Sequence, residues 1–274
     1  MMGGQPQMGA STTRPALSGG QPKGASMRKR TIVLSILGGL VGLAVIDGGG
    51  QMIRASDAIS GPVDLTGVTR LAVTGATSDI SISTRGDGAR EAVLSGTRHG
   101  WGAIWRSGWF AGDCAGQARM TRDGDTLTVD MGERGGFFGW NDWDDCTLSL
   151  NAQLAPEAMV SIHQNASRIR LSGDFSVIDV DSDAGDFAFS GHAASVAATG
   201  AALRALLAFE RVTNTEEIRI SGKMLDATVR FLTPTPISYG VEAIASYVDS
   251  ALANTPGARP DIRIRGEMVR VRIE

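Results

Sequence analysis

Aromatic and acidic side chains concentrate in residues 99–146, which makes this stretch the first candidate for recognition chemistry. Flat aromatic faces offer contact area to sugars and proteins at little entropic cost, and paired carboxylates are what glycan cleavage needs. Three interpretations are open: a local core, which we favour, a glycan- or partner-binding surface, and contact with the membrane interface, where tryptophan is favoured. The candidate binding surface is formed by all five tryptophans of the chain, with carboxylates beside them: Trp101, Trp105, Trp109, Trp140 and Trp143, with Asp142, Asp144 and Asp145.

A second acidic motif resembles the start of a calcium-binding loop. Asp179, Asp181 and Asp183 occupy what would be positions 1, 3 and 5 of an EF-hand. However, glycine falls at position 7 instead of 6, and Ser190 stands at position 12, where a bidentate glutamate is required. In a strand the three aspartates share one face, so a solvated acidic stripe is the simpler interpretation. They are kept as weak calcium candidates, and no other metal site is expected.

Catalytic signatures are missing from the sequence. It contains no H-E-x-x-H, G-x-S-x-G or P-loop motif. Its three histidines, His99, His163 and His192, are scattered, and there is no C-x-x-C pair to complete a zinc site. We therefore expect no catalytic residues, no cofactor and no enzymatic activity.

Two cysteines, Cys114 and Cys146, flank part of the tryptophan-rich stretch. An even cysteine count in an exported domain predicts a disulfide, and two free buried thiols are the alternative. The bond would close a glycine-rich loop that few other constraints hold.

The N-terminal segment carries the signals for location. Residues 1–46 contain five basic and no acidic residues, and residues 31–46 form an uncharged, mostly apolar run behind a basic flank. This pattern predicts a disordered cytoplasmic tail over 1–30 and a membrane anchor or signal segment over 31–53, in contact with the lipid bilayer. A cleaved signal peptide and a buried helix are the alternatives. We expect a single-pass protein of the bacterial inner membrane, with its body in the periplasm.

Beyond the anchor, residues 54–67 are expected to be a linker and residues 68–274 a β-repeat domain. The chain after residue 46 has 21 basic and 29 acidic residues, a net charge of −8. Such an acidic body argues against binding to nucleic acid, which needs a basic surface.

A short phrase recurs in the second half of the chain and predicts the architecture. Apolar and polar residues alternate and a glycine ends each unit, in residues 169–173, 218–222 and 262–266. Period-two alternation places the apolar side chains on one face of a strand. Many such strands with glycine turns between them predict an all-β fold of stacked short strands, either β-solenoid-like or an elongated sandwich.

Two stretches leave the choice between helix and strand open. Residues 201–210 place Leu203, Leu206 and Leu207 on one helical face. Residues 239–254 fit helical spacing but also alternate through Tyr239, Val241 and Ala243.

The recurring Gly-Asp turns, as at Gly173-Asp174 and Gly185-Asp186, and the Ile-Arg-Ile strands give the chain a family resemblance from about Leu71 onward. It resembles the adhesin-like β-strand repeat proteins of the bacterial envelope, a family largely without assigned function. The resemblance implies stacked β-repeats behind a membrane anchor or signal, favours a strand at 239–254, and supplies no catalytic residues. We expect a structural or interaction module, adhesin-like or a scaffold, with an envelope protein or a glycan as its partner. The alternative is a glycan-binding or glycan-acting protein that uses the tryptophan-rich stretch.

Overall fold

The computed structural model describes residues 61–86, 88–98, 118–132 and 146–274. These residues form ten strands, and the part of the chain described contains no helix suited to crossing a membrane. The strands are β1 (Val63–Asp64), β2 (Arg70–Ser83), β3 (Glu91–Arg98), β4 (Arg119–Asp123), β5 (Thr126–Asp130), β6 (Cys146–Gln153), β7 (Ala158–Phe209), β8 (Glu217–Phe231), β9 (Ser238–Ser250) and β10 (Asp261–Ile273).

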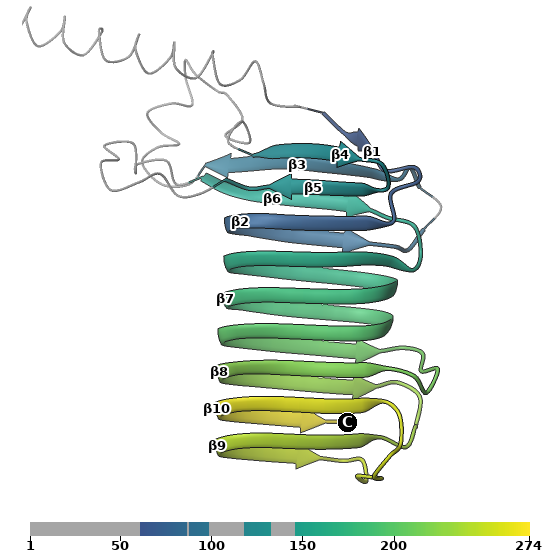
Figure 1. The fold of residues 1–274 in the computed structure, drawn as a ribbon, viewed down its shortest axis with the longest axis vertical. Coiled ribbons are helices and arrows are strands. Elements are labelled where there is room, and N and C mark those ends of the chain that lie inside the picture. Colours follow the sequence, from purple (N-terminus) through teal and green to yellow (C-terminus); the bar gives the residue numbers. More distant parts are fainter. Residues whose placement is uncertain (1–60, 87, 99–117, 133–145) are drawn as a thin grey trace, which may run out of the picture. The chain divides into compact units, whose positions relative to one another are not determined.

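β2 and the chain from β7 onward form coils that stack on one another in parallel (Figure 1). β2 pairs in parallel with the start of β7, the end of β7 pairs with β8, β8 pairs with β10, and β10 pairs with β9. The C-terminal strand β10 therefore lies between β8 and β9, and β9 is the last coil of the stack. The prediction of an all-β fold is confirmed, and the parallel stacking favours its solenoid-like form over the sandwich.

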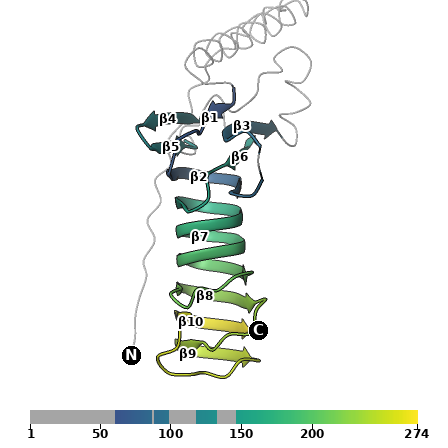
Figure 2. The same cartoon turned by 90° about the vertical axis from the view of Figure 1, so that its right-hand side faces the viewer.

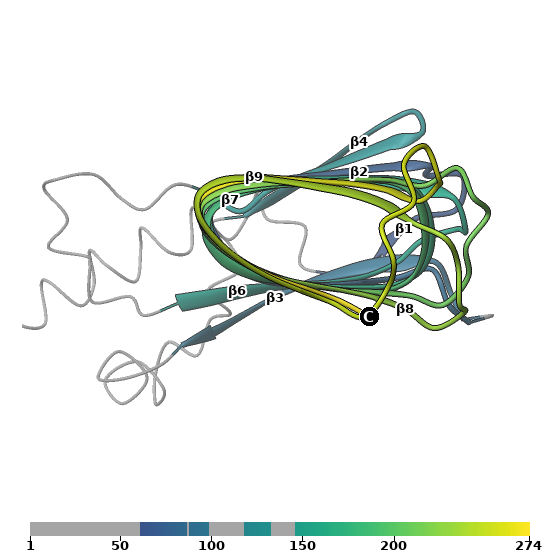
Figure 3. The ribbon, with the colours of Figure 1, turned by 90° about the horizontal axis from the view of Figure 1, so that it is seen from below.

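Each coil has two arms joined by a corner. Figure 2 shows the coils stacked from β7 through β8 and β10 to β9, and seen along the stack they superpose as a flattened ring (Figure 3). In β10 the first arm is 261–266 and the second is 268–273, and Glu267 at the corner is left out of the pairing with both neighbours. The ladders continue on both sides of these corners. For this reason β7 is one 52-residue strand, where the sequence pattern predicted several short ones.

Every second residue of each arm points into the coil, and these side chains together form the core. Ile218 and Ile220 of β8 lie in register with Ile262 and Ile264 of β10, and all four are buried. A column of phenylalanines runs through the second arms: the ring centroids of Phe189 and Phe209 are 5.4 Å apart, and those of Phe209 and Phe231 are 5.3 Å apart. Stacking equivalent side chains between coils buries a continuous core that no single coil could form.

The glycines that end the second and third copies of the phrase, Gly222 and Gly266, allow neighbouring coils to pack closely, because a side chain there would collide with the next coil. Gly200, Gly222 and Gly266 are aligned in successive coils. A Cβ atom on Gly222 would lie 2.0 Å from the carbonyl oxygen of Gly200, and one on Gly266 would lie 2.7 Å from that of Gly222. Gly173, which ends the first copy of the phrase, belongs to a second arm and has a positive φ of 108°.

The other end of the described fold is built differently. β3 pairs antiparallel with β6 and with β1, and β4 and β5 form a hairpin whose β5 joins β2. Val63 lies in β1, and Leu65 is fully buried, so the fold begins inside the segment that the sequence pattern assigned to a linker.

Both ambiguous stretches are strands. Residues 201–209 belong to β7, where Leu203 and Leu207 face the core and Leu206 faces outward. The helical interpretation of this stretch was wrong, because the tertiary ladder with β8 holds it extended. Residues 238–250 form β9, as the family resemblance implied.

Candidate functional site: a groove at the corner of the coils

An open groove of about 830 Å³ runs across the corner between the first and second arms, over five neighbouring coils. Its lining comes from β7, β8, β10 and β9, at equivalent positions of each coil. The stack itself therefore builds the groove, since every position is repeated at the spacing of neighbouring strands, about 4.8 Å.

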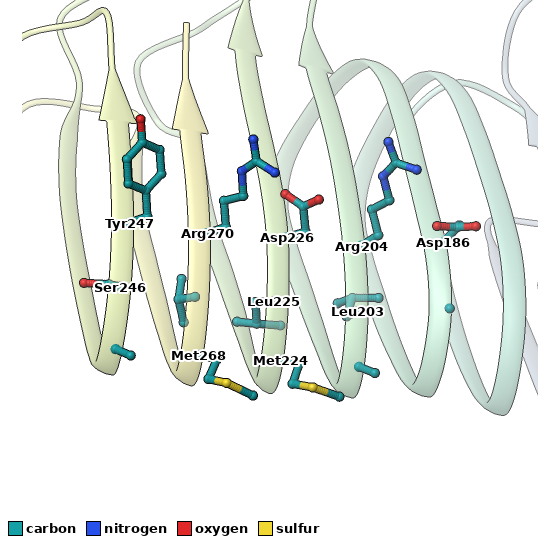
Figure 4. A pocket seen from close by; sticks show the side chains of 14 residues that line it. Asp186, Leu203, Arg204, Met224, Leu225, Asp226, Ser246, Tyr247, Met268 and Arg270 are labelled. Atoms are coloured by element: carbon teal, nitrogen blue, oxygen red, sulfur yellow. The ribbon is translucent and has the colours of Figure 1, made fainter.

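One wall of the groove is a row of alternating charge. Arg204 lies in register with Asp226, Asp226 with Arg270, and Arg270 with Tyr247. Figure 4 shows these four side chains and Asp186 following one another across the coils. We call Asp186, Arg204, Asp226 and Arg270 the charge row. All four are exposed, so the row offers both signs of charge to a partner.

The other wall is apolar and follows the corner itself. Met224 lies in register with Met268, and Ala202 and Ala245 flank them in the coils on either side. Met224 is 50% exposed and Met268 is 55% exposed. We call these two residues the methionine pair. Unbranched, polarizable methionine side chains adapt to the shape of a partner, and they are common at surfaces that bind proteins.

The groove combines an adaptable apolar strip with charges of both signs along a straight line of coils. An apolar centre with flanking charges is the composition of protein-binding surfaces, in which burial supplies affinity and charge supplies orientation. Its open, extended form suits a polypeptide segment or a protein edge better than an enclosed small molecule, because small-molecule sites bury most of the ligand surface.

Among the residues that the structure describes, the most strongly buried carboxylate lies outside the groove, in the connection between β7 and β8. Glu216 is fully buried. Burial raises the pKa of its carboxyl, but hydrogen bonds from the Thr213 backbone N–H, the Thr213 hydroxyl and the Thr215 backbone N–H outweigh this, and the net pKa is lowered. Nδ1 of His192 lies 3.5 Å from Oε1 of Glu216. Because Thr213 and Thr215, which donate to this carboxylate, belong to the turn itself, we assign this cluster to the fold of the connection.

The acidic motif of β7 lies along the outer face of one coil. Asp179, Asp181 and Asp183 alternate with the buried Val180 and Ser182, so they lie on the outer face of the coil. Asp181 lies 3.7 Å from Nδ1 of His163 in the neighbouring coil. Within the described ranges, no three acidic, histidine or cysteine side chains converge as a metal site. The interpretation as a solvated acidic stripe fits this placement.

The tryptophan-rich candidate surface lies outside the residues that the structure describes. This applies to Trp101, Trp105, Trp109, Trp140, Trp143 and Cys114. Cys146 is the first residue of β6. The role of the tryptophans and the bond between the two cysteines therefore stay predictions.

Sequence reasoning missed the groove, although the repeats contain a signal for it. Met224 and Met268 each stand two residues after the glycine that ends a repeated phrase, at Gly222 and Gly266. When the second and third copies of the phrase are aligned and the alignment is continued past their glycines, Met224 falls on Met268 and Asp226 falls on Arg270. Exposure of the methionines depends on the corner, however, and the alternation pattern does not reveal where the corner falls.

No family model matches the chain, and no curated protein matches it. Two solved structures are similar to it. One is described as a "putative cell adhesion protein" from Clostridium sporogenes, with 10% identity, a TM-score of 0.43, and coverage of 78% of this chain and 97% of that one. The other is a "putative adhesin" from Bacteroides fragilis, with 11% identity, a TM-score of 0.41, and coverage of 78% and 94%.

Proposed function

We propose that this protein is a non-catalytic interaction protein of the bacterial envelope, adhesin-like or a scaffold, which holds a protein partner along the corner groove. The observation that carries the proposal is the methionine pair, two half-exposed apolar side chains in register beside the charge row. Leaving such side chains in water forgoes the free energy that burial would give, about 1.5–3 kcal/mol for a whole side chain. A partner that covers them recovers part of it.

The envelope location in this proposal rests on the sequence. The basic flank and apolar run of residues 28–53 support an inner-membrane anchor with the basic flank on the cytoplasmic side, which puts the body on the periplasmic side. A single-pass anchor would hold the coils near the membrane, where an envelope protein or a second surface is within reach.

The proposal is tested by purifying the tagged full chain from crosslinked cells and comparing two double variants. Met224→Glu with Met268→Glu places charge in the apolar strip of the groove. Leu206→Glu with Leu232→Glu is the matched control, because both leucines are exposed but do not line the groove. We expect the groove variant to lose a defined set of crosslinked proteins that the control keeps. Recovery of the same proteins with both variants would overturn the proposal.

A further inference from the structure

The last coil of the stack ends the core abruptly. Tyr239 and Val241 of β9 are aligned with Ile262 and Ile264 of β10, which are fully buried, yet both are only half-buried. On the second arm, Val248 is aligned with the buried Val271 and is itself 39% exposed. The inward positions of β9 therefore face an end that no other described strand covers.

The start of this edge is blocked by the chain itself. The side-chain amide of Asn254 accepts a hydrogen bond from the backbone N–H of Tyr239 at 3.1 Å and donates one to its carbonyl oxygen at 2.9 Å. In the same connection, the Thr255 N–H donates to the carbonyl oxygen of Ile237. A side chain thus substitutes for a neighbouring strand at Tyr239. By strand alternation, the N–H and C=O groups of Val241 and Ala243 point the same way as those of Tyr239, so the open edge continues beyond the blocked position.

Beyond that point β9 lacks the features that normally keep a sheet edge from pairing. Residues 238–250 contain no lysine, arginine or proline. Their two carboxylates are directed at the neighbouring coil, β10: Glu242 lies 3.1 Å from Nε of Arg265, and Asp249 lies 3.4 Å from Nε of Arg272. The edge therefore presents no unpaired formal charge, although the body of the protein is acidic. Two copies of this edge meet without the like-charge repulsion that such a body would otherwise impose.

The shape of the β9 end restricts which kind of partner can cover it. β9 is a coil of two arms and a corner, with half-exposed core positions on both arms. A single extended peptide follows one arm only and leaves the open core uncovered. A second copy presents the same two arms, the same corner and its own open core positions. From this we infer that the β9 end is a homodimer interface, in which a second copy of this chain docks end to end, β9 against β9.

A two-fold axis between the ends makes the contact self-complementary and closed, and it makes the facing strands antiparallel, a pairing that sheets readily accept. The interface covers Val241, Val248 and the exposed Ile244 of both copies. This inference does not depend on a partner in the corner groove, because the contacts lie on the edge of β9.

The test measures the association of the full chain in detergent by sedimentation velocity over a range of concentrations. Val241→Arg and Val248→Arg each place a charge at an inward position that faces the open end and does not line the groove. Leu206→Arg is the matched control, because Leu206 is 41% exposed on a coil in the middle of the stack. We expect a concentration-dependent dimer whose Kd rises at least about tenfold in both edge variants, equivalent to about 1.4 kcal/mol. The control should keep the Kd of the parent, and unchanged melting temperatures would show that all variants are folded.

A photo-crosslinking residue at Ile244, which is 86% exposed on β9 and does not line the groove, gives a second measurement. The inference predicts an adduct of twice the mass of the chain. Three results would each overturn it: a monomer at every concentration, a dimer with the same Kd in parent and edge variants, or Ile244 adducts with foreign proteins alone.

Discussion

Glu216 shows how one buried side chain holds the connection between two coils. Its carboxylate accepts three hydrogen bonds from Thr213 and Thr215, and its backbone carbonyl accepts one from the Asp261 N–H, which begins β10. The carboxylate therefore organises the turn after β7, and the main chain at the same residue links that turn to β10. Nothing in the alternation pattern marks Glu216 as buried, because a glutamate beside a strand is normally expected to be exposed.

Replacing Glu216 with glutamine should lower the free energy of unfolding by about 1–3 kcal/mol, because the amide NH₂ would face a backbone N–H and leave part-buried polar groups of the turn unpaired. Glu217→Gln is the control: Glu217 contacts Arg219 at the surface, where an ion pair contributes little. Chemical denaturation of the full chain at neutral pH measures both. Equal losses in the two variants would contradict the role given to Glu216.

The same residue gives a pH dependence with a defined sign. The pKa of Glu216 is lower in the folded chain than its ordinary value of 4.5. Its contribution to stability is therefore fully present above pH 4.5 and is lost as the pH falls through the lower folded value. The difference in unfolding free energy between the parent and Glu216→Gln should shrink on acidification below pH 4.5. A difference that stays constant with pH would show that ionisation of Glu216 is not involved.

At the scale of elements, the repeated phrase predicted strands and their inward faces well. Ile218, Ile220, Ile262 and Ile264 are buried as their alternation required. Alternation reports which face of a strand is apolar, and a stack of coils buries that face. It does not report which strands are neighbours, so the placement of β10 between β8 and β9 could not be predicted. The groove was missed for the same reason, because its residues meet only through that order.

The corner glycines allow a direct test of the stacking. Gly222→Ala should destabilise the protein by at least about 1–3 kcal/mol, the usual cost of overpacking, because its Cβ would lie 2.0 Å from the carbonyl oxygen of Gly200. Gly88→Ala is the control, since a Cβ there meets nothing within 4 Å. Thermal unfolding of the full chain measures the difference. If the two variants melt alike, the coils do not approach as closely at this corner as the structure indicates.

At the scale of the whole molecule, topology rests on the asymmetry of charge about residues 31–53. An export-dependent phosphatase fused after Glu274 should be active, and the active fusion should sediment with membranes. A fusion after Arg30, ahead of the apolar run, is the control and should be inactive. An expressed but inactive fusion after Glu274 would contradict export, and activity in the soluble periplasmic fraction would indicate a cleaved signal instead of an anchor.

The claim that the corner groove binds a protein partner is tested most directly by photo-crosslinking in living cells. A photo-reactive residue is placed at Met224 or Met268 of the full chain, and at Leu206, which is exposed outside the groove, as the matched control. The account predicts the same discrete protein adduct from both groove positions and none from Leu206. Adducts of equal yield at all three positions, or none at Met224 and Met268 in cells that contain the folded protein, would contradict it.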